Sequence, residues 1–384
     1  MKFFHLSDLH IGKQLHHYNL KEDQIAILEE IVQFAREMHP DAILIAGDIY
    51  DKSVPSAEAI KIFDDFLTQL SGIRPEIPIL IISGNHDNAQ RLQYASGILK
   101  NHHIYLVGNV PRTKEEHIEK IVLTDEYGDI DIYMLPFFKP SYVSGIFDDM
   151  SDSYSDVMRQ LIDREEIDFK NRRNILMSHQ FYVGKREPDT CDSESVCVGG
   201  IDHIDVSCVE SFDYVALGHL HGRQWIGKEH IRYCGTLLKY SVSEMNHCKC
   251  LTMVSLNEKG KKPEITEIML HPLRDIKQKK GKLNDILSNA RKDEKEDYIS
   301  VILTDETEPY HPKEQLQAVY SHILEIKIDN TRTRNKLMEC SEEKVSVKDP
   351  FNAFCDFYIE MQGKSMDEDE MRIMKKVFEE IEEE

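Results

Sequence analysis

The sequence predicts an α/β fold built around a mostly parallel sheet. Three short apolar runs, at residues 3–7, 42–46 and 79–82, have the length and composition of buried strands. Two amphipathic stretches lie between them, at residues 21–38 and 56–70. Strands that alternate with helices in this way form parallel sheets with right-handed crossover connections.

Length and composition indicate a soluble protein of two or three domains. The chain has 384 residues, of which 41% are hydrophobic and 30% are charged. No apolar run approaches the roughly 18 residues that a membrane helix needs, and the first residues lack the pattern of a signal peptide. The eight cysteines are scattered. We therefore expect reduced thiols in a cytoplasmic protein.

The net charge of −22 opposes any nucleic-acid function, because the chain as a whole repels phosphate. Much of the acid lies in two C-terminal segments, 367–370 and 379–384. Bound divalent cations would also reverse the field locally. A basic run, Lys277 to Lys282, is more often a solvated surface than a DNA contact. Charge therefore leaves a nucleic-acid substrate possible.

The middle of the chain predicts a second sheet. Two apolar runs, at 118–123 and 130–135, flank a turn-like segment and predict a hairpin, which favours a more antiparallel sheet. A polar helix is expected at 153–169 and a long polar loop at 181–198. Further strands are expected at residues 174–177, 214–217, 231–235 and 251–256.

The pattern changes near residue 271. We expect a first domain at 1–270, a small α+β domain at 271–330, a linker at 331–348 and a helical tail at 349–384. Within the small domain we expect a strand at 298–303, a helix at 314–325 and a strand at 326–328.

The tail carries two apolar stripes at helical spacing. They comprise Phe351, Phe354, Tyr358 and Met361, followed by Met371, Met374, Phe378 and Ile381. Two short helices cannot bury such faces by themselves, so the stripes favour a partner-binding role. Packing on the chain's own domain is the alternative.

Polar side chains follow five of the apolar runs. They are Asp8 and His10, Asp48, Asn85 and His86, His179, and His219 and His221. Each could be an ordinary strand exit or helix cap when taken alone. Taken together, imidazole nitrogens with carboxylate and amide oxygens suit a first-row divalent ion such as Mn²⁺, Fe²⁺ or Zn²⁺. Seven donors, with His86 left aside as a proton carrier, suit two ions about 4 Å apart that share one carboxylate.

These motifs together resemble the calcineurin-like metallophosphoesterases, and in finer detail the bacterial SbcD group, the nuclease subunits of SbcCD complexes. The resemblance is dense over the first 270 residues and looser beyond them. It is carried by residues 7–12, 47–51, 83–87 with Arg91 and Leu92, 178–181, 198–200, 213–221 and 231–241.

The resemblance implies a four-layer α/β/β/α sandwich with two Mn²⁺ ions. One ion would be held by Asp8, His10, Asp48 and His221, and the other by Asp48, Asn85, His179 and His219. Asp48 would bridge the two ions, and His86 would be the catalytic histidine beside the scissile phosphate. Asp51 or Asp87 would orient His86, although Asp87 could equally hold its own turn.

The resemblance also implies a function and partners. The family acts as a DNA exonuclease and as an endonuclease on duplex ends and hairpins, in DNA repair, recombination and replication. The small domain would correspond to a capping domain, and the tail would dock on the coiled-coil base of an SbcC-type ATPase. We expect a homodimer within a heterotetramer, with the helices at 56–70 and 89–99 as candidate dimer surfaces.

Two other functions remain open from the residues alone. The same metal set serves phosphatases and phosphodiesterases that act on substrates other than DNA. A subunit whose main task is to bind its ATPase partner is a further alternative. Mn²⁺-dependent digestion of linear duplex DNA, compared with hydrolysis of phosphoserine peptides, distinguishes these possibilities.

Overall fold

The computed structural model describes residues 1–147, 151, 153–194, 202–307, 309–334, 350–362 and 364–382. The chain divides into two compact units. One comprises Met1–Ile302 and His311–Ile326, and the other comprises Leu303–Tyr310 and Lys327–Glu384.

The first sheet has six strands in the order β16-β15-β1-β4-β5-β6. Four of them are parallel: β1 (Lys2–Leu6), β4 (Ala42–Ala46), β5 (Ile79–Ile82) and β6 (Ile104–Val107). The other two, β15 (Cys250–Ser255) and β16 (Glu264–Met269), continue the sheet in antiparallel pairing. The predicted strands at the start of the chain are therefore confirmed.

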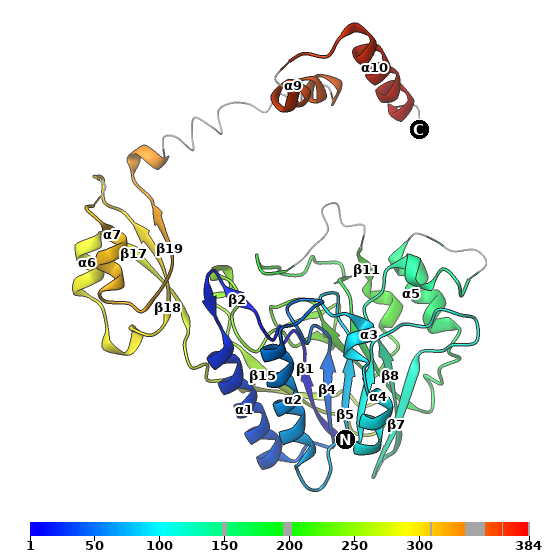
Figure 1. The fold of residues 1–384 in the computed structure, drawn as a ribbon. Helices are drawn as coiled ribbons and strands as arrows, with labels where there is room; N and C mark the ends of the chain where they lie inside the picture. Colours follow the sequence, from blue (N-terminus) through cyan, green and yellow to red (C-terminus); the bar gives the residue numbers. More distant parts are fainter. Residues whose placement is uncertain are drawn as a thin grey trace. The chain divides into compact units, whose positions relative to one another are not determined.

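Two helices, α1 (Lys21–Met38) and α2 (Ala57–Ser71), cover one face of this sheet (Figure 1). Alternate strand side chains such as Phe4, Leu6 and Ile43 belong to the core on that face, together with apolar residues of both helices. This burial explains the helical spacing of apolar residues in the two amphipathic stretches.

The second sheet also has six strands, in the order β13-β14-β12-β9-β8-β7. Its strands are β7 (Glu119–Asp125), β8 (Gly128–Leu135), β9 (Arg173–His179), β12 (Tyr214–Gly218), β13 (Gln224–Ile226) and β14 (Lys228–Tyr233). The outer face packs on α5 (Tyr154–Asp163), which contributes Val157, Met158 and Leu161 to a separate core.

The inner faces of the two sheets share one core. Leu44, Ala46 and Ile82 of the first sheet lie in the same buried cluster as Met177 and Ala216 of the second. The central strands are thus buried on both faces, which is why they are continuous apolar runs rather than alternating ones. The result is the predicted four-layer α/β/β/α arrangement.

Two predictions about elements were wrong. The second sheet is not more antiparallel than the first, because β8, β9, β12 and β14 run parallel and only its two edge pairs are antiparallel. The hairpin signal is local and determines only the β7–β8 pair. The predicted helix at 314–325 is a short helix, α7 (Pro312–Gln317), followed by a strand, β19 (His322–Ile328). Pairing of β19 with β18 at the edge of the sheet outweighs the helical spacing of the apolar residues in this segment.

Residues beyond Leu270 form a three-stranded sheet, β17-β18-β19, from β17 (Ile276–Gly281), β18 (Tyr298–Leu303) and β19. A short helix, α6 (Leu283–Ser288), follows β17. Part of this segment contacts α1, because Arg274 pairs with Asp23 at 2.9 Å and the Tyr298 hydroxyl donates to the same carboxylate at 2.9 Å.

The basic run at Lys277 to Lys282 makes local ion pairs. Lys277 lies 2.8 Å from Asp297, and Lys279 lies 2.6 Å from Glu294. These two ammonium groups are therefore partly neutralised within their own sheet, in agreement with the interpretation of this run as surface.

The tail contains two helices, α9 (Pro350–Gln362) and α10 (Glu368–Glu382). They contact one another: the Tyr358 hydroxyl donates to Glu370 at 3.0 Å, and the Lys375 ammonium lies 5.7 Å from the centre of the Phe351 ring. Among the residues that the structure describes, no helix combines the length and apolar character needed to cross a bilayer.

The remaining elements are short. They are β2 (Gln14–Leu15), β3 (Tyr18–Asn19), α3 (Ala89–Leu92), α4 (Ser96–Leu99), β10 (Tyr182–Val183), β11 (Ile204–Asp205) and 3₁₀ turns at Lys100–His102, Pro140–Val143, Val206–Val209, Val242–Glu244 and Lys292–Glu294.

Candidate metal centre

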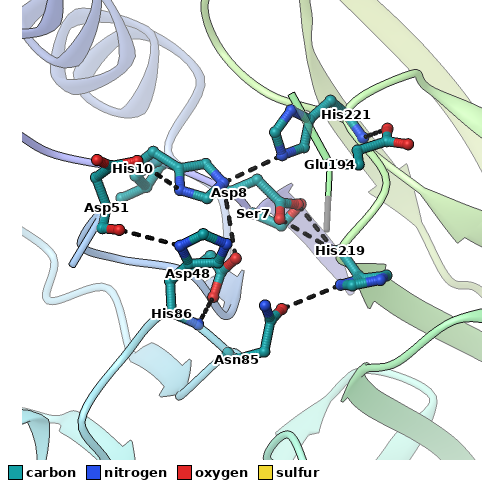
Figure 2. Close-up of polar contacts among 12 residues, drawn as sticks. Ser7, Asp8, His10, Asp48, Asp51, Asn85, His86, Glu194, His219 and His221 are labelled. Atoms are coloured by element: carbon teal, nitrogen blue, oxygen red, sulfur yellow. Dashed lines mark hydrogen bonds and ion pairs between the residues drawn. The ribbon is translucent and has the colours of Figure 1, made fainter. Parts of the chain in front are cut away.

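The polar motifs converge because each follows the carboxyl end of a parallel strand. Asp8 and His10 follow β1, Asp48 follows β4, and Asn85 follows β5. From the second sheet, His179 ends β9, and the segment from His219 to His221 follows β12. Ligand sites of open α/β sheets lie at this edge, and here both sheets contribute to it (Figure 2).

One group of donors comprises Asp8, His10 and His221, whose nearest ligand atoms lie within 4.8 Å of one another. The Nε2 atoms of His10 and His221 point at each other across 3.1 Å (Figure 2). All three side chains are buried. Two ring nitrogens facing each other beside a carboxylate form a typical cation site.

A second group lies around Asn85. Its Oδ1 atom is 3.1 Å from His179 Nε2 and 3.1 Å from His219 Nδ1. The other ring nitrogen of His179, Nδ1, donates to the main-chain oxygen of Ala46 at 2.8 Å. That bond leaves His179 Nε2 without a proton when the ring is neutral, so this atom can act as a ligand.

Asp48 lies between the two groups. Its Oδ2 atom is 3.6 Å from His10 Nε2 and 3.5 Å from His179 Nε2. The other oxygen, Oδ1, accepts the main-chain N–H of His86 at 2.9 Å. Asp48 is thus placed to be shared between the two groups.

Burial makes the donor set chemically unusual. It lowers the pKa of His219 to about 3 and holds the pKa of His10 well below its usual value, so both rings are neutral. Burial alone would raise the pKa of Asp48, but the adjacent His179 outweighs it and holds the carboxyl ionised. Asp48 and Asp8 in turn overcome the burial of His179 and raise its pKa to about 9.

These residues fit a divalent cation. Among the described donor residues, two buried ring nitrogens, His10 Nδ1 and His219 Nε2, have no hydrogen-bond partner. Burying several imidazoles beside two carboxylates is costly unless a positive charge compensates them. His10 and His219 as neutral rings and Asp48 as an ionised carboxylate are in the forms that bind metals.

A comparison with protein-family models identifies the fold. The model described as calcineurin-like phosphoesterase matches residues 1–223. The chain belongs to this family. Its members are phosphoesterases that use divalent metals, and the first 223 residues contain every donor described above.

The similarity to known proteins continues through the C-terminal part. Residues 269–362 match the model described as type 5 capsule protein repressor C-terminal domain. The SbcD subunit of the nuclease SbcCD from Staphylococcus epidermidis is 34% identical over 328 residues, which are 84% of each chain. Within the calcineurin-like phosphoesterases, the chain therefore belongs to the SbcD family.

Two solved structures resemble the chain more distantly. GAP50 of Plasmodium, titled as the anchor in the inner membrane complex, is 14% identical, with a TM-score of 0.39 over 71% of this chain and 89% of its own. A dimetal phosphatase from Danio rerio is 15% identical, with a TM-score of 0.40 over 71% of this chain and 99% of its own.

In this member of the SbcD family, His86 lies at the edge of the donor set. It is half-buried, and its ring is perpendicular to that of His10 with 4.9 Å between ring centres. Its Nδ1 atom is 3.0 Å from the main-chain oxygen of Asp51. The structure thus places Asp51 beside His86 through its carbonyl group, while the Asp51 carboxylate pairs with Lys13 at 2.8 Å.

Asp87 contacts the strand ends instead. Its carboxylate accepts the main-chain N–H groups of Ile49, Tyr50 and Gly84 at 3.1, 3.0 and 2.9 Å. Asp87 therefore joins the segments after β4 and β5, which carry Asp48 and Asn85.

A cleft of about 510 Å³ opens beside Asn85 and His219. Lys139, Arg112 and Tyr142 also line it. The segment that carries Lys139 is fixed at this position, because the Phe137 N–H donates to the Ser83 oxygen at 3.0 Å. A phosphate-bearing substrate can approach the donors through this cleft.

Sequence reasoning missed the residues that support His221. Ser193, Glu194 and Glu244 all contact His221 or its main chain. Ser193 and Glu194 lie in the segment expected to be a featureless polar loop, and no spacing rule marks them. The motif residues at 198–200 lie outside the described residues.

The predicted partner-binding residues lie in the second unit. Phe351, Phe354, Tyr358 and Met374 are half-buried, and Met371 is exposed. The side chains of Phe378 and Ile381 lie outside the described residues. Other apolar side chains in the same helices are more exposed than Met371. They are Phe357, Met361 and Ile373, which are 56%, 65% and 60% exposed. The sequence stripes do not include Phe357 or Ile373.

Proposed function

We propose that this chain is a Mn²⁺-dependent DNA exonuclease and structure-specific endonuclease subunit, which acts on duplex ends and hairpins. The observation that carries the phosphodiester chemistry is the buried donor set, with Asp48 between His10 and His179. The nucleic-acid substrate is inferred from the staphylococcal relative, which is part of a nuclease and aligns over 84% of each chain.

Asp8, His10, Asp48 and His221 would hold one ion, and Asp48, Asn85, His179 and His219 the other. Two bound divalent ions would supply a nucleophilic water at neutral pH and neutralise charge on the phosphate. The protein contributes rigid placement, since these donors are fixed by strand ends and by hydrogen bonds to neighbouring main-chain groups.

His86 is proposed as the proton carrier. The Asp51 main-chain oxygen accepts a hydrogen bond from the N–H group at His86 Nδ1, which leaves Nε2 to exchange a proton with the substrate. The ring is the most exposed imidazole of the constellation, so a leaving oxygen can reach it from solvent. Asp51 is proposed to orient His86 through this main-chain oxygen.

An SbcC-type ATPase is the proposed partner, acting with the chain in DNA repair, recombination and replication. The match of residues 269–362 to the C-terminal family model and the exposed apolar side chains of α9 and α10 support this proposal. We also propose a homodimer within a heterotetramer. Three exposed apolar side chains of the first unit suit a dimer contact: Ile60 in α2, Ile98 in α4, and Tyr94 just before α4.

The proposal is tested by digestion of end-labelled linear duplex and hairpin DNA with Mn²⁺, with and without the ATPase. A phosphoserine peptide and bis-p-nitrophenyl phosphate serve as competing substrate classes. We expect DNA cleavage that the ATPase stimulates. Hydrolysis of the peptide with no cleavage of either DNA would instead favour a phosphatase, and loss of all hydrolysis would favour a scaffold role.

A further inference from the structure

The side of His221 that faces away from Asp8 and His10 is enclosed by hydrogen bonds. His221 Nδ1 lies 2.7 Å from the hydroxyl oxygen of Ser193. The same hydroxyl lies 2.6 Å from Oε1 of Glu244. The main-chain N–H of His221 donates to Glu194 at 2.6 Å. Two residues of one loop and one residue of a distant turn therefore hold the ring and the main chain of a single histidine.

Glu244 in this network can only accept hydrogen bonds. The Lys249 ammonium donates to its Oε2 atom at 2.6 Å, and the main-chain N–H of Tyr240 donates to Oε1 at 3.1 Å. Glu244 is fully buried, and Lys249 is nearly so. A carboxylate that accepts hydrogen bonds from an ammonium and from a backbone N–H is ionised, so it has no proton to donate.

The direction of each hydrogen bond follows from this. A serine hydroxyl has one proton, and at 2.6 Å from an acceptor-only oxygen that proton must lie toward Glu244. The Ser193 oxygen therefore accepts a hydrogen bond from the N–H group at His221 Nδ1. The neutral ring then carries its proton on Nδ1 and its lone pair on Nε2, the atom that faces His10 Nε2 across 3.1 Å.

We propose that Ser193 and Glu244 are positioning residues that hold His221 in the Nδ1-protonated tautomer and so prepare Nε2 to bind a divalent cation. The inference rests on the proposed metal centre and adds two residues to it. His179 obtains the same tautomer from a rigid strand, since its Nδ1 atom donates to the Ala46 carbonyl at 2.8 Å. His221 obtains it from a side chain on a loop.

The loop itself is tied to the segment that carries Glu244. The main-chain N–H of Asp192 donates to the Ser243 hydroxyl at 3.0 Å, next to the Ser193–Glu244 bond. The cation affinity of the His221 site therefore depends on how this loop sits against residues 241–244. No comparable dependence is expected at His179.

The first test measures Mn²⁺ binding to the full chain by electron paramagnetic resonance titration. Ser193→Ala removes the hydroxyl, and we expect about 10-fold weaker binding of one of the two ions. Ser193→Thr keeps a hydroxyl and restores the affinity lost in the alanine variant. Ser144→Ala, an exposed serine of a different segment, is the matched control and binds both ions as the wild type does. Thermal melting confirms that all variants are folded.

The second test reads the tautomer directly in the metal-free chain, from ¹⁵N chemical shifts of the histidine rings, with His221 assigned by its loss in His221→Asn. We expect a protonated Nδ1 in the wild type and a mixture of tautomers in Ser193→Ala. An unchanged affinity, an unchanged tautomer or failure of threonine to restore binding would overturn the inference. Neither readout uses DNA, so a wild-type chain that fails to cut DNA refutes the proposed function alone.

Discussion

Four of the proposed ligand residues adopt backbone conformations that L-amino acids rarely use. Asp8, His10, Asp48 and His219 have φ angles of 52°, 43°, 51° and 114°. None of the four is a glycine, so each conformation is strained relative to an ordinary strand exit and persists because the surroundings hold it. Such strain concentrates at sites where side-chain direction matters more than stability.

Replacement of His86 separates chemistry from metal binding. His86 contacts the donor set through its main-chain N–H and by ring packing on His10. We therefore expect His86→Ala to retain both ions and to lose at least ~10²-fold in DNA cleavage, the usual contribution of a proton carrier. Metal analysis and single-turnover cleavage measure the two effects. Wild-type cleavage rates in this variant would remove His86 from the mechanism.

Gly84 is required for close approach. A Cβ atom at this position would overlap the Asp48 carboxylate and its backbone nitrogen. We expect Gly84→Ala to displace Asp48, to impair binding of both ions and to destabilise the fold by about 1–3 kcal/mol. Isothermal titration with Mn²⁺ and thermal denaturation check this.

The matched control for Gly84 is Gly97→Ala in α4, where a Cβ atom meets nothing within 4 Å. That variant should bind Mn²⁺ as the wild type does, and its stability should not fall, because alanine favours a helix. Equal effects of the two substitutions would show that close packing at Gly84 is unimportant.

At the scale of elements, an ion pair at the end of β7 connects the β7–β8 hairpin to β9. Asp125, the last residue of β7, pairs with the buried guanidinium of Arg173 at the start of β9. Burial alone would raise the pKa of Asp125, but the Arg173 guanidinium outweighs it and holds the pKa well below the usual range. The folded state therefore prefers the ionised carboxylate more than the unfolded chain does.

A pH-dependent loss of stability follows for Asp125→Asn. Because the pKa of Asp125 is depressed on folding, its contribution is complete above the unfolded value of about 4 and is lost as the pH falls below it. We expect Asp125→Asn to lower the free energy of unfolding by about 3 kcal/mol at pH 7, because Arg173 and the Met1 ammonium lose a shared carboxylate. The difference should shrink below pH 4 in urea denaturation. A difference that is the same at pH 3 and pH 7 would contradict it.

The exposure of side chains in the two tail helices indicates which of them contact a partner. Phe351 and Tyr358 make contacts within the helix pair, whereas Phe357 and Ile373 present their side chains to solvent. We expect Phe357→Glu with Ile373→Glu to weaken binding to an SbcC-type coiled coil by about 10²-fold or more, as for buried interface anchors. Surface plasmon resonance with the ATPase measures this.

The exposed residue Lys364, substituted as Lys364→Glu, is the matched control for a change of charge in the tail. It should bind nearly as the wild type does. If the double substitution leaves partner binding intact while the chain stays folded, the tail is not the docking segment.

At the scale of the whole molecule, the net charge of −22 opposes binding to a polyanion. The described ion pairs neutralise several cations locally, including Lys277 and Lys279. Under the proposed function, the attractive charge for DNA would come from bound metal ions and from a few side chains of the cleft, such as Lys139 and Arg112.

We accordingly expect the isolated chain to bind DNA weakly and with a steep dependence on salt. Each phosphate contact adds about 0.9 to the slope of log affinity against log salt concentration. Fluorescence anisotropy with a labelled duplex between low and moderate salt, in the presence and absence of the ATPase, measures the slope. Tight binding of the isolated chain at high salt would refute this expectation.

By itself, the sequence determined the strand ends and the donor types. Runs such as residues 42–46 and 79–82 are buried on both faces, so their apolar character is unbroken and their limits are visible. The metal-binding chemistry of Asp48, Asn85 and His179 follows from their residue types. Their positions at strand ends follow from the visible limits of the apolar runs. Strand limits and residue types are local properties, so they can be read from the sequence alone.

Only the tertiary structure decided the pairing of the second sheet, the strand at His322–Ile328 and the support of His221. Ser193 lies 28 positions from His221 and 51 from Glu244, and no periodicity connects residues at such separations. Hydrogen bonds between loops depend on which distant segments the fold brings together. Pairing with a neighbouring strand such as β18 decides whether an ambiguous apolar run becomes a helix or a strand.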